Sequence, residues 1–232
     1  MPPKFSIIIP AHNEEEYIKK TLHSIKNQTY QNYETIVVTN GCTDKTEEIV
    51  KKRLNDKTKH LSLSKANVCI ARNSGAFEAQ GEIFLFLDAD TTLEDDSLQK
   101  INEQFSSEYS VATTKVLPDS DNLKYRLAMK FKNLYNSTNI YNGCSGALIC
   151  RKEDFNNVKG YNPEIIVKEH RKLIIELKNK TGKKFKCIDT NVTTSMRRFK
   201  KWGLTKATIF WIKQWMNNYL GDLKKSDYEK VR

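Results

Sequence analysis

The hydrophobic residues of this chain fall into short unbroken runs, separated by stretches in which apolar residues recur at helical spacing. The most continuous run, residues 83–87, has five apolar residues and leads directly into Asp88. Similar runs occupy residues 5–10 and 35–38. Unbroken runs of this length are typical of strands buried on both faces, as in a parallel sheet covered by helices.

The segments between these runs have the spacing of amphipathic helices. After the first run, Ile18, Leu22 and Ile25 fall on one helical face. Further helices are predicted over residues 45–54, 67–79, 93–105, 123–135 and 164–179, and further strands over 61–63, 111–116, 147–150 and 185–188. Strands that alternate with helices predict an α/β fold with a mostly parallel central sheet flanked by helices.

The charge divides the chain into two parts. Residues 168–232 carry 18 lysines and arginines against 6 acidic residues, a charge of +12, while the whole chain carries +11. We therefore expect one α/β domain over residues 1–200 and a basic tail over residues 201–232. Such a basic block attracts anions, but a lysine-rich surface that is simply well solvated is an equal alternative.

The tail contains a predicted amphipathic helix over residues 205–219. Its apolar face has two interpretations: it lies on an anionic membrane, or it packs on the domain or on a second copy. The apolar positions of this face are Ile209, Ile212, Trp215, Met216 and Tyr219.

Several features favour a cytoplasmic protein that could lie peripherally on the cytoplasmic face of the membrane. No stretch approaches the ~18 apolar residues of a transmembrane helix, and no signal-peptide pattern precedes the first strand. The five cysteines are widely spaced without a C-x-x-C pair, which favours reduced thiols. The sequence makes no prediction about oligomeric state.

The candidate chemistry lies at the end of the central strand. Asp88 and Asp90 are two positions apart, so in an extended segment their carboxylates point to the same side. Ligands of open α/β sheets bind beyond the carboxyl ends of the strands. Two carboxylates there favour a bound Mg²⁺ or Mn²⁺, whereas a solvated acidic turn is the alternative.

Three segments together resemble a known family. FSIIIPAHNEEEYIKKTLHSI, ETIVVTNGCTDKTEEIV and ARNSGAFEAQGEIFLFLDADT, in this order, resemble family 2 glycosyltransferases over residues 4–200. The resemblance implies the GT-A fold, and an inverting transfer of a sugar from a nucleoside-diphosphate sugar. The acceptor would be a glycan or another hydroxyl compound, or a polyprenyl phosphate.

The resemblance also implies roles for particular residues. Asp88 and Asp90 would bind the cation, and Gly143, Ser145 and Gly146 would lie on the acceptor side. The residues implied in binding the nucleotide sugar are Pro10, Ala11, Asn13, Glu14, Asn40, Asp44, Arg72, Asp88, Ala89, Arg197 and Arg198.

Two positions depart from the family pattern. Asn40 stands where many relatives have an aspartate, which weakens any inference about the nucleobase. Glu169-His170 stands where inverting members have a Glu-Asp pair that contains the general base. We expect Glu169 to be the base, with His170 as the second candidate. An acceptor that is already an anion, such as a lipid phosphate, needs no base.

Two other functions remain as alternatives. A nucleotidyltransferase would share the sheet and the acidic site, but its first loop usually contains glycine and lysine, which residues 11–14 lack. A basic nucleic-acid-binding protein with a degenerate catalytic domain would explain the charge of the tail. The combination of Glu14, Asp88, Asp90 and the arginines argues against degeneration, so nucleic-acid binding is not expected.

Overall fold

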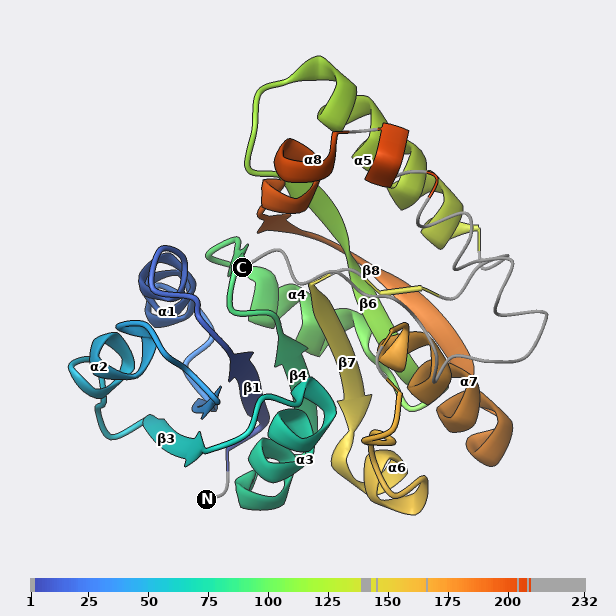
Figure 1. Cartoon of the computed structure of the whole chain (residues 1–232). Coiled ribbons are helices and arrows are strands. Elements are labelled where there is room, and N and C mark those ends of the chain that lie inside the picture. Colours follow the sequence, from blue (N-terminus) through green and yellow to red (C-terminus); the bar gives the residue numbers. More distant parts are fainter. Residues whose placement is uncertain are drawn as a thin grey trace.

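The computed structural model describes residues 3–138, 143–144, 146–165, 167–203, 205–207 and 209. Strands and helices alternate along most of this length (Figure 1). The strands are β1 (Phe5–Ala11), β2 (Tyr33–Asn40), β3 (Thr58–Leu63), β4 (Ile83–Leu87), β5 (Thr91–Leu93), β6 (Tyr109–Pro118), β7 (Ala147–Arg151) and β8 (Lys184–Thr194). The helices are α1 (Ile18–Lys26), α2 (Thr46–Lys51), α3 (Val68–Glu78), α4 (Ser97–Gln104), α5 (Leu123–Ser137), α6 (Lys152–Asn157), α7 (Glu169–Thr181) and α8 (Arg197–Trp202).

The described strands form one sheet in the order β3-β2-β1-β4-β7-β6-β8-β5. The first four are parallel neighbours, and β6 and β8 are also parallel to each other. β7 and β5 run antiparallel to the strands that they pair with. The predicted α/β fold with a mostly parallel sheet is therefore confirmed. Because β1, β2 and β4 are parallel, the residues that follow them meet at one edge of the sheet.

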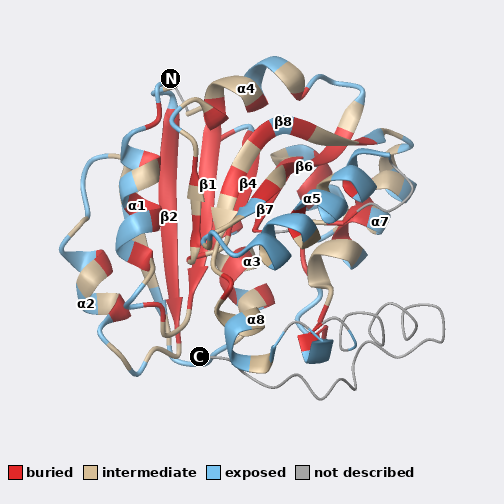
Figure 2. Cartoon of the chain, turned by 90° about the horizontal axis from the view of Figure 1, so that it is seen from above, coloured by how far each residue is buried: buried red, intermediate tan, exposed pale blue. Residues whose placement is uncertain are grey.

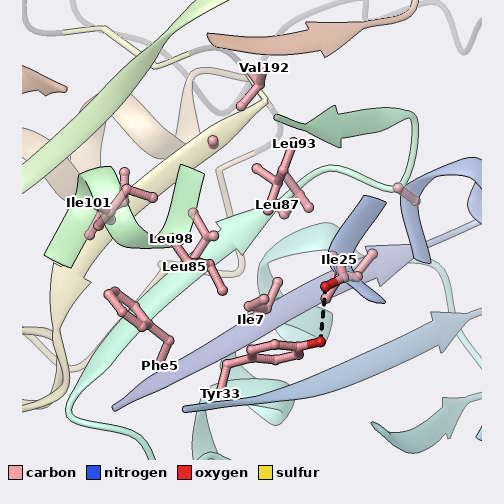
Figure 3. Close-up of a cluster of buried hydrophobic side chains, with 14 of the residues drawn as sticks. Phe5, Ile7, Ile25, Tyr33, Leu85, Leu87, Leu93, Leu98, Ile101 and Val192 are labelled. Atoms are coloured by element: carbon pink, nitrogen blue, oxygen red, sulfur yellow. Dashed lines mark hydrogen bonds between the residues drawn. The ribbon is translucent and has the colours of Figure 1, made fainter. Parts of the chain in front are cut away.

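The larger part of the core lies between the sheet and α1, α2, α4 and α5. Alternate residues of β1 and β4, among them Ile7 and Leu85, point to this side and pack against Ile25 and Leu98 (Figure 3). The hydroxyl of Tyr33 is buried in this layer and donates to the backbone carbonyl of Ile25 at 2.9 Å. The strand residues between them point to the other side, as the period of a strand requires.

The second face of the sheet is covered by α3, α6 and α7. Phe84 and Phe86 of β4 pack there against Phe155 and Tyr161. Figure 2 shows the consequence: the central strands are buried, whereas the outer faces of the helices are exposed. The unbroken apolar run over residues 83–87 is therefore explained, because all five side chains of β4 are buried.

Two predicted elements differ from the structure, and one helix was not predicted. Leu93 belongs to strand β5 rather than to a helix, because Thr91–Leu93 pairs with β8, and the helix begins only at Ser97. The helix predicted from residue 164 begins at Glu169, after Lys168 adopts a left-handed conformation with φ of 62°. Helix α6 was not predicted; it is only six residues long.

No helix in the described ranges is both long enough and apolar enough to cross a bilayer. Most of the predicted amphipathic helix at residues 205–219 lies outside the described residues. The boundary at residue 200, the cytoplasmic location and the membrane contact of the tail all stay predictions.

Candidate active site

Acidic side chains gather at the carboxyl edge of the parallel strands. Glu14 follows β1, and Asp88 and Asp90 follow β4. The backbone nitrogen of Thr91 donates to the carbonyl of Asp88 at 3.0 Å, which forms a tight turn after the strand. The side chain of Asp88 is 37% exposed and that of Asp90 is 16% exposed. Both carboxylates are therefore partly accessible at this edge.

Arg72 of α3 bridges two of the predicted site residues. Its Nη2 lies 2.8 Å from Oδ1 of Asp88, and its Nη1 lies 2.9 Å from Oε1 of Glu169. Its guanidinium also lies over the ring of Tyr161, 5.3 Å from the centroid. Arg72 is almost fully buried, so the two carboxylates are held by a cation with little access to solvent. The arrangement joins α3, β4 and α7 at one point.

The charge of Arg72 also determines the protonation of Glu169 and His170. Burial alone would raise the pKa of Glu169, but the charge of Arg72 and the hydrogen bonds to the carboxylate outweigh it and lower that pKa below its ordinary value. Burial, assisted by the charge of Arg72, lowers the pKa of His170 to about 4. Nδ1 of His170 lies 2.8 Å from the hydroxyl of Tyr161. At neutral pH the site therefore contains an ionised Glu169 and a neutral imidazole.

A second arginine, Arg197 at the start of α8, joins the other acidic residues. Its two terminal nitrogens donate to the two carboxylate oxygens of Glu14, each at 2.7 Å. Nη2 also lies 3.0 Å from Oδ2 of Asp90. The guanidinium lies over the ring of Tyr17, 4.8 Å from the centroid. Arg198, the next residue, has its guanidinium over Trp202 instead, at 5.7 Å.

A cavity of about 410 Å³ opens beside this cluster. It lies between the loop after β1, the loop after β2 and helix α8. Its lining residues are Asn13, Glu15, Glu16, Tyr17, Asp44, Arg197 and Lys201. Three predicted nucleotide-sugar-binding residues, Asn13, Asp44 and Arg197, are therefore brought together around one cavity.

The other predicted residues on this side fix the two loops to each other. The side chain of Asn40 is buried; it donates to the carbonyl of Ala11 at 2.9 Å and accepts from the backbone nitrogen of Asn67 at 3.1 Å. Asp44 accepts from the backbone nitrogens of Glu15 and Thr46. Asn40 and Asp44 therefore shape the cavity through hydrogen bonds within the protein.

Pro10, Ala11 and Ala89 contribute backbone rather than reactive side chains. Pro10 and Ala11 end strand β1, in register with the end of β2. Ala89 is buried between the two aspartates, and its carbonyl accepts from the hydroxyl of Thr21 in α1 at 2.7 Å. That hydrogen bond fixes the turn that carries Asp88 and Asp90.

The acceptor-side turn is described only in part. Ser145 lies outside the described residues, whereas Gly143, Cys144 and Gly146 lie within them. The carbonyl of Gly146 accepts from the backbone nitrogen of Asp88 at 2.9 Å, so this turn lies beside the acidic pair. Burial raises the pKa of the Cys144 thiol to about 12, which makes it a poor nucleophile.

The acidic pair fits a divalent cation when part of the coordination comes from a ligand. Among the described residues, no three His, Cys, Asp or Glu side chains gather closely enough to hold a metal ion. Mg²⁺ is commonly held by one or two carboxylates together with substrate phosphates, and carboxylate oxygens are hard ligands that suit it. Asp88 and Asp90 supply two such carboxylates at an accessible edge.

Comparison with known families decides what kind of protein has this site. The model of the family described as Glycosyl transferase family 2 matches residues 6–203, which is most of the chain. The chain belongs to this family. The predicted family, and with it the predicted class of enzyme, a glycosyltransferase, are confirmed by this match.

Two individual relatives each match less than half of this family-2 chain. A glycosyltransferase of Haemophilus influenzae described as uncharacterized is 39% identical over 102 residues, which are 42% of this chain and 40% of that protein. A poly(ribitol-phosphate) beta-N-acetylglucosaminyltransferase, TarS of Staphylococcus aureus, is 35% identical over 101 residues, which are 41% of this chain and 18% of that protein. The match thus spans less than half of either relative.

Solved structures share the fold. The structure of residues 1–349 of S. aureus TarS in complex with UDP-GlcNAc has a TM-score of 0.65 and 22% identity, covering 83% of this chain and 58% of that one. A mannosyltransferase of Pyrobaculum calidifontis, in complex with GDP-Man and Mn²⁺, has a TM-score of 0.71 and 17% identity, covering 83% and 57%. The predicted GT-A fold is therefore confirmed.

Two aromatic residues of the site were not predicted from the sequence. Tyr17 lies under Arg197, and Tyr161 lies between Arg72 and His170. Tyr161 lies in the Gly-Tyr-Asn-Pro segment at residues 160–163. This segment resembles the turn that precedes the Glu-Asp pair in the family, so the position of Tyr161 gave a weak signal. Tyr17 gave none, because it directly precedes α1 at the helical spacing of an ordinary apolar residue.

Proposed function

We propose that this family-2 chain transfers a sugar from a nucleoside-diphosphate sugar to an acceptor, with inversion at the anomeric carbon. The observation that carries the proposal is the pairing of Asp88 with Arg72 and of Asp90 with Arg197 at the carboxyl edge of the sheet. The site thus combines carboxylates that suit a cation with cations that suit a diphosphate.

The proposed reaction is a single displacement. An oxygen of the acceptor forms a bond to the anomeric carbon, and the bond from that carbon to the diphosphate oxygen breaks. The electron pair of the broken bond leaves with the nucleoside diphosphate. Arg72 and Arg197 are the two arginines that lie next to Asp88 and Asp90, where they can stabilise the charge of the departing diphosphate.

A divalent cation fits this proposal at Asp88 and Asp90. When bound, Mg²⁺ or Mn²⁺ would neutralise part of the charge that develops on the departing diphosphate. The relative from P. calidifontis was solved with Mn²⁺, which supports the proposal without deciding the ion used here. In the structure, Arg197 neutralises Asp90 and Glu14.

The nucleotide is proposed to occupy the cavity between the loops after β1 and β2. Its wall is formed by Asn13, Asp44 and Tyr17, with Arg197 at the end nearest the acidic pair. Solved relatives carry UDP-GlcNAc and GDP-Man, so both uridine and guanosine nucleotides are candidates.

The bases available bear on the nature of the acceptor. Glu169 has a lowered pKa and His170 a pKa of about 4, so both are weak bases while Arg72 is paired with Glu169. A hydroxyl acceptor requires the donor to draw Arg72 away from Glu169, which would restore the basicity of that carboxylate. An anionic acceptor such as a polyprenyl phosphate requires no base. The weak bases favour the anionic acceptor.

The proposal is tested by measuring binding and turnover in the same preparations. Calorimetry with UDP and GDP, with and without Mn²⁺, should show metal-dependent binding of one nucleotide. Nucleotide-sugar hydrolysis and transfer to a polyprenyl phosphate or to a glycan should fall about 100-fold or more in Asp88→Asn and Asp90→Asn. Asp189→Asn is the matched control, because Asp189 is an exposed aspartate in a surface ion pair with Lys115.

The alternative functions make different predictions for the same samples. A nucleic-acid-binding protein would bind RNA independently of metal and would have no affinity for either nucleotide. A nucleotidyltransferase would release pyrophosphate from a nucleoside triphosphate. Full transfer activity in the double variant with Asp88→Asn and Asp90→Asn would contradict the proposed use of the acidic pair.

A further inference from the structure

Helix α5 carries an exposed apolar stripe that the proposed reaction does not use. Its four members, which are between 57% and 78% exposed, are Leu123, Leu127, Phe131 and Leu134. At 3.6 residues per turn these positions fall within roughly 80° of arc. The opposite side of α5 faces the domain, where Met129 is buried and Asn133 donates to the carbonyl of Val116. The stripe is therefore turned away from the core, as Figure 2 shows by the exposed colouring of most of α5.

The polar residues of α5 are strongly biased in charge. Lys124, Arg126 and Lys130 are exposed, and Leu123–Ser137 contains no acidic residue. By helical spacing, Arg126 and Lys130 border one side of the stripe and Lys124 borders the other. An apolar stripe edged by cations is the pattern of a helix that lies in the plane of a membrane surface.

We propose that α5 docks this protein on an anionic membrane surface. The stripe enters the boundary between headgroups and acyl chains, and the bordering cations contact anionic headgroups. This site is distinct from the tail at residues 201–232, for which the sequence pattern left membrane contact as one of two interpretations.

Charge complementarity favours an anionic membrane over the other partners that an apolar helix face could bind. A second copy would bring the same three bordering cations against each other, on a chain whose net charge is +11. Residues 210–232 of the chain itself carry five basic and three acidic residues, so they do not complement α5 either. Nucleic acid is disfavoured because three of the four stripe residues are leucines, which cannot stack on bases as aromatic rings do.

The position of α5 links this surface to the candidate active site. The helix follows β6 and precedes the turn that contains Gly143 and Gly146 (Figure 1). The ring of Tyr125 on α5 lies 6.1 Å from that of Phe199 on α8, the helix that begins with Arg197. Docking through α5 would therefore bring a membrane surface to the side of the molecule where α8 lies.

The test is cosedimentation of the full chain with vesicles, with no donor or acceptor present, so it does not depend on the proposed function. The chain should bind vesicles of phosphatidylcholine and phosphatidylglycerol in equal parts, and bind vesicles of phosphatidylcholine alone much less. Binding should weaken as salt rises to about 0.5 M, because the Debye length shortens. Absence of binding to the anionic vesicles would overturn the proposal.

Three variants assign the binding to α5. The pair Leu127→Ser with Phe131→Ser should lower partitioning about tenfold, and so should replacement of Lys124, Arg126 and Lys130 by glutamine. Phe131→Trp should preserve binding, since tryptophan favours the membrane interface.

Matched controls separate α5 from the rest of the surface. Phe77→Ser removes an aromatic residue of α3 that is 87% exposed, and it should leave partitioning unchanged. Replacement of Lys19, Lys20 and Lys26 of α1 by glutamine removes three exposed cations elsewhere and should have a much smaller effect than the α5 triple. Urea denaturation of every variant shows whether it is folded.

Two results would overturn the proposal in favour of another occupant. Unchanged binding of both α5 variants would assign the membrane contact to another surface, such as the basic tail. A dimer in light scattering that the α5 variants dissociate, without vesicle binding by the wild type, would assign α5 to a second copy.

Discussion

Arg197 and Glu14 form a two-pronged ion pair across 183 positions of sequence, with both N···O distances at 2.7 Å. The pair connects the loop after the first strand to the helix after the last strand. Glu14 is almost fully buried, so its carboxylate depends on Arg197 for compensation. Because Arg197 also contacts Asp90, this pair links the cavity to the acidic end of β4.

Replacement of Arg197 should therefore affect both stability and nucleotide binding. Arg197→Ala leaves the buried Glu14 without its cation and should lower the free energy of unfolding by about 3 kcal/mol in urea denaturation. Arg197→Lys keeps the positive charge but cannot donate two parallel hydrogen bonds to the carboxylate, so it should lower the free energy of unfolding by less. Lys200→Ala is the control, because its pair with Asp119 is exposed and should be worth at most about 1 kcal/mol. Equal losses in Arg197→Ala and Lys200→Ala would contradict this account.

Arg72→Gln should raise the pKa of Glu169. The buried guanidinium is the charge that lowers this pKa against the effect of burial, and it also neutralises Asp88. Without it, two carboxylates share the site, so the variant should lose about 3 kcal/mol of stability at neutral pH and recover part of that loss as the pH falls. Urea denaturation at several pH values measures both effects. A loss that does not depend on pH would contradict this role of Arg72.

His170 should make the protein less stable as the pH falls below neutrality. Its pKa is about 4 in the folded state against an ordinary value of 6.5, so the unfolded state binds more protons between these limits. The contribution of the neutral His170 to the free energy of unfolding is fully present above pH 6.5 and is lost as the pH falls toward 4. This contribution is at most about 3 kcal/mol, because each unit of pKa difference corresponds to about 1.36 kcal/mol.

His170→Asn should reduce this pH dependence of stability. Asparagine does not titrate and can keep a hydrogen bond to the hydroxyl of Tyr161. His60 also has a pKa lowered by burial and contributes in the same direction, so the relevant quantity is the difference between wild type and variant. Parallel stability curves for the two proteins between pH 4 and 6.5 would show that His170 is not the group involved.

Gly146→Ala should be more harmful than Gly182→Ala, although both glycines have positive φ values, of 77° and 68°. A Cβ at Gly146 would lie 2.8 Å from Oγ1 of Thr91, whereas nothing lies within 4 Å of one at Gly182. Gly182→Ala should lower the free energy of unfolding only by the backbone strain of a left-handed residue, about 1 kcal/mol. Gly146→Ala should cost more and should also weaken metal-dependent nucleotide binding, because the carbonyl of Gly146 accepts from Asp88. Thermal unfolding and calorimetry measure the two effects, and equal behaviour of the two variants would contradict the steric argument.

The strands of the sheet were well predicted because their signals are local. The run over residues 83–87 is apolar at every position, and such a run is typical of a strand covered on both faces. β5 was missed for the opposite reason. Its three residues, Thr91–Leu93, are a strand only because β8 lies beside them, and β8 is about 100 residues further along the chain.

The pairing of the site residues could not be read from their types. Asp88 and Asp90 were correctly placed at the end of a buried strand, but the sequence could not show that one is paired with Arg72 and the other with Arg197. The low pKa values of Glu169 and His170 are likewise set by burial and by a charge from another helix.

The sequence by itself determined the alternation of strands and helices, the family, and the position of the acidic pair, because these follow from local hydrophobic period and motif spacing. The tertiary structure decided which cation compensates each carboxylate, how weak the two candidate bases are, and which face of α5 stays exposed. The physical reason is that Coulomb interactions and burial depend on distance in space, whereas the patterns of a sequence record only distance along the chain.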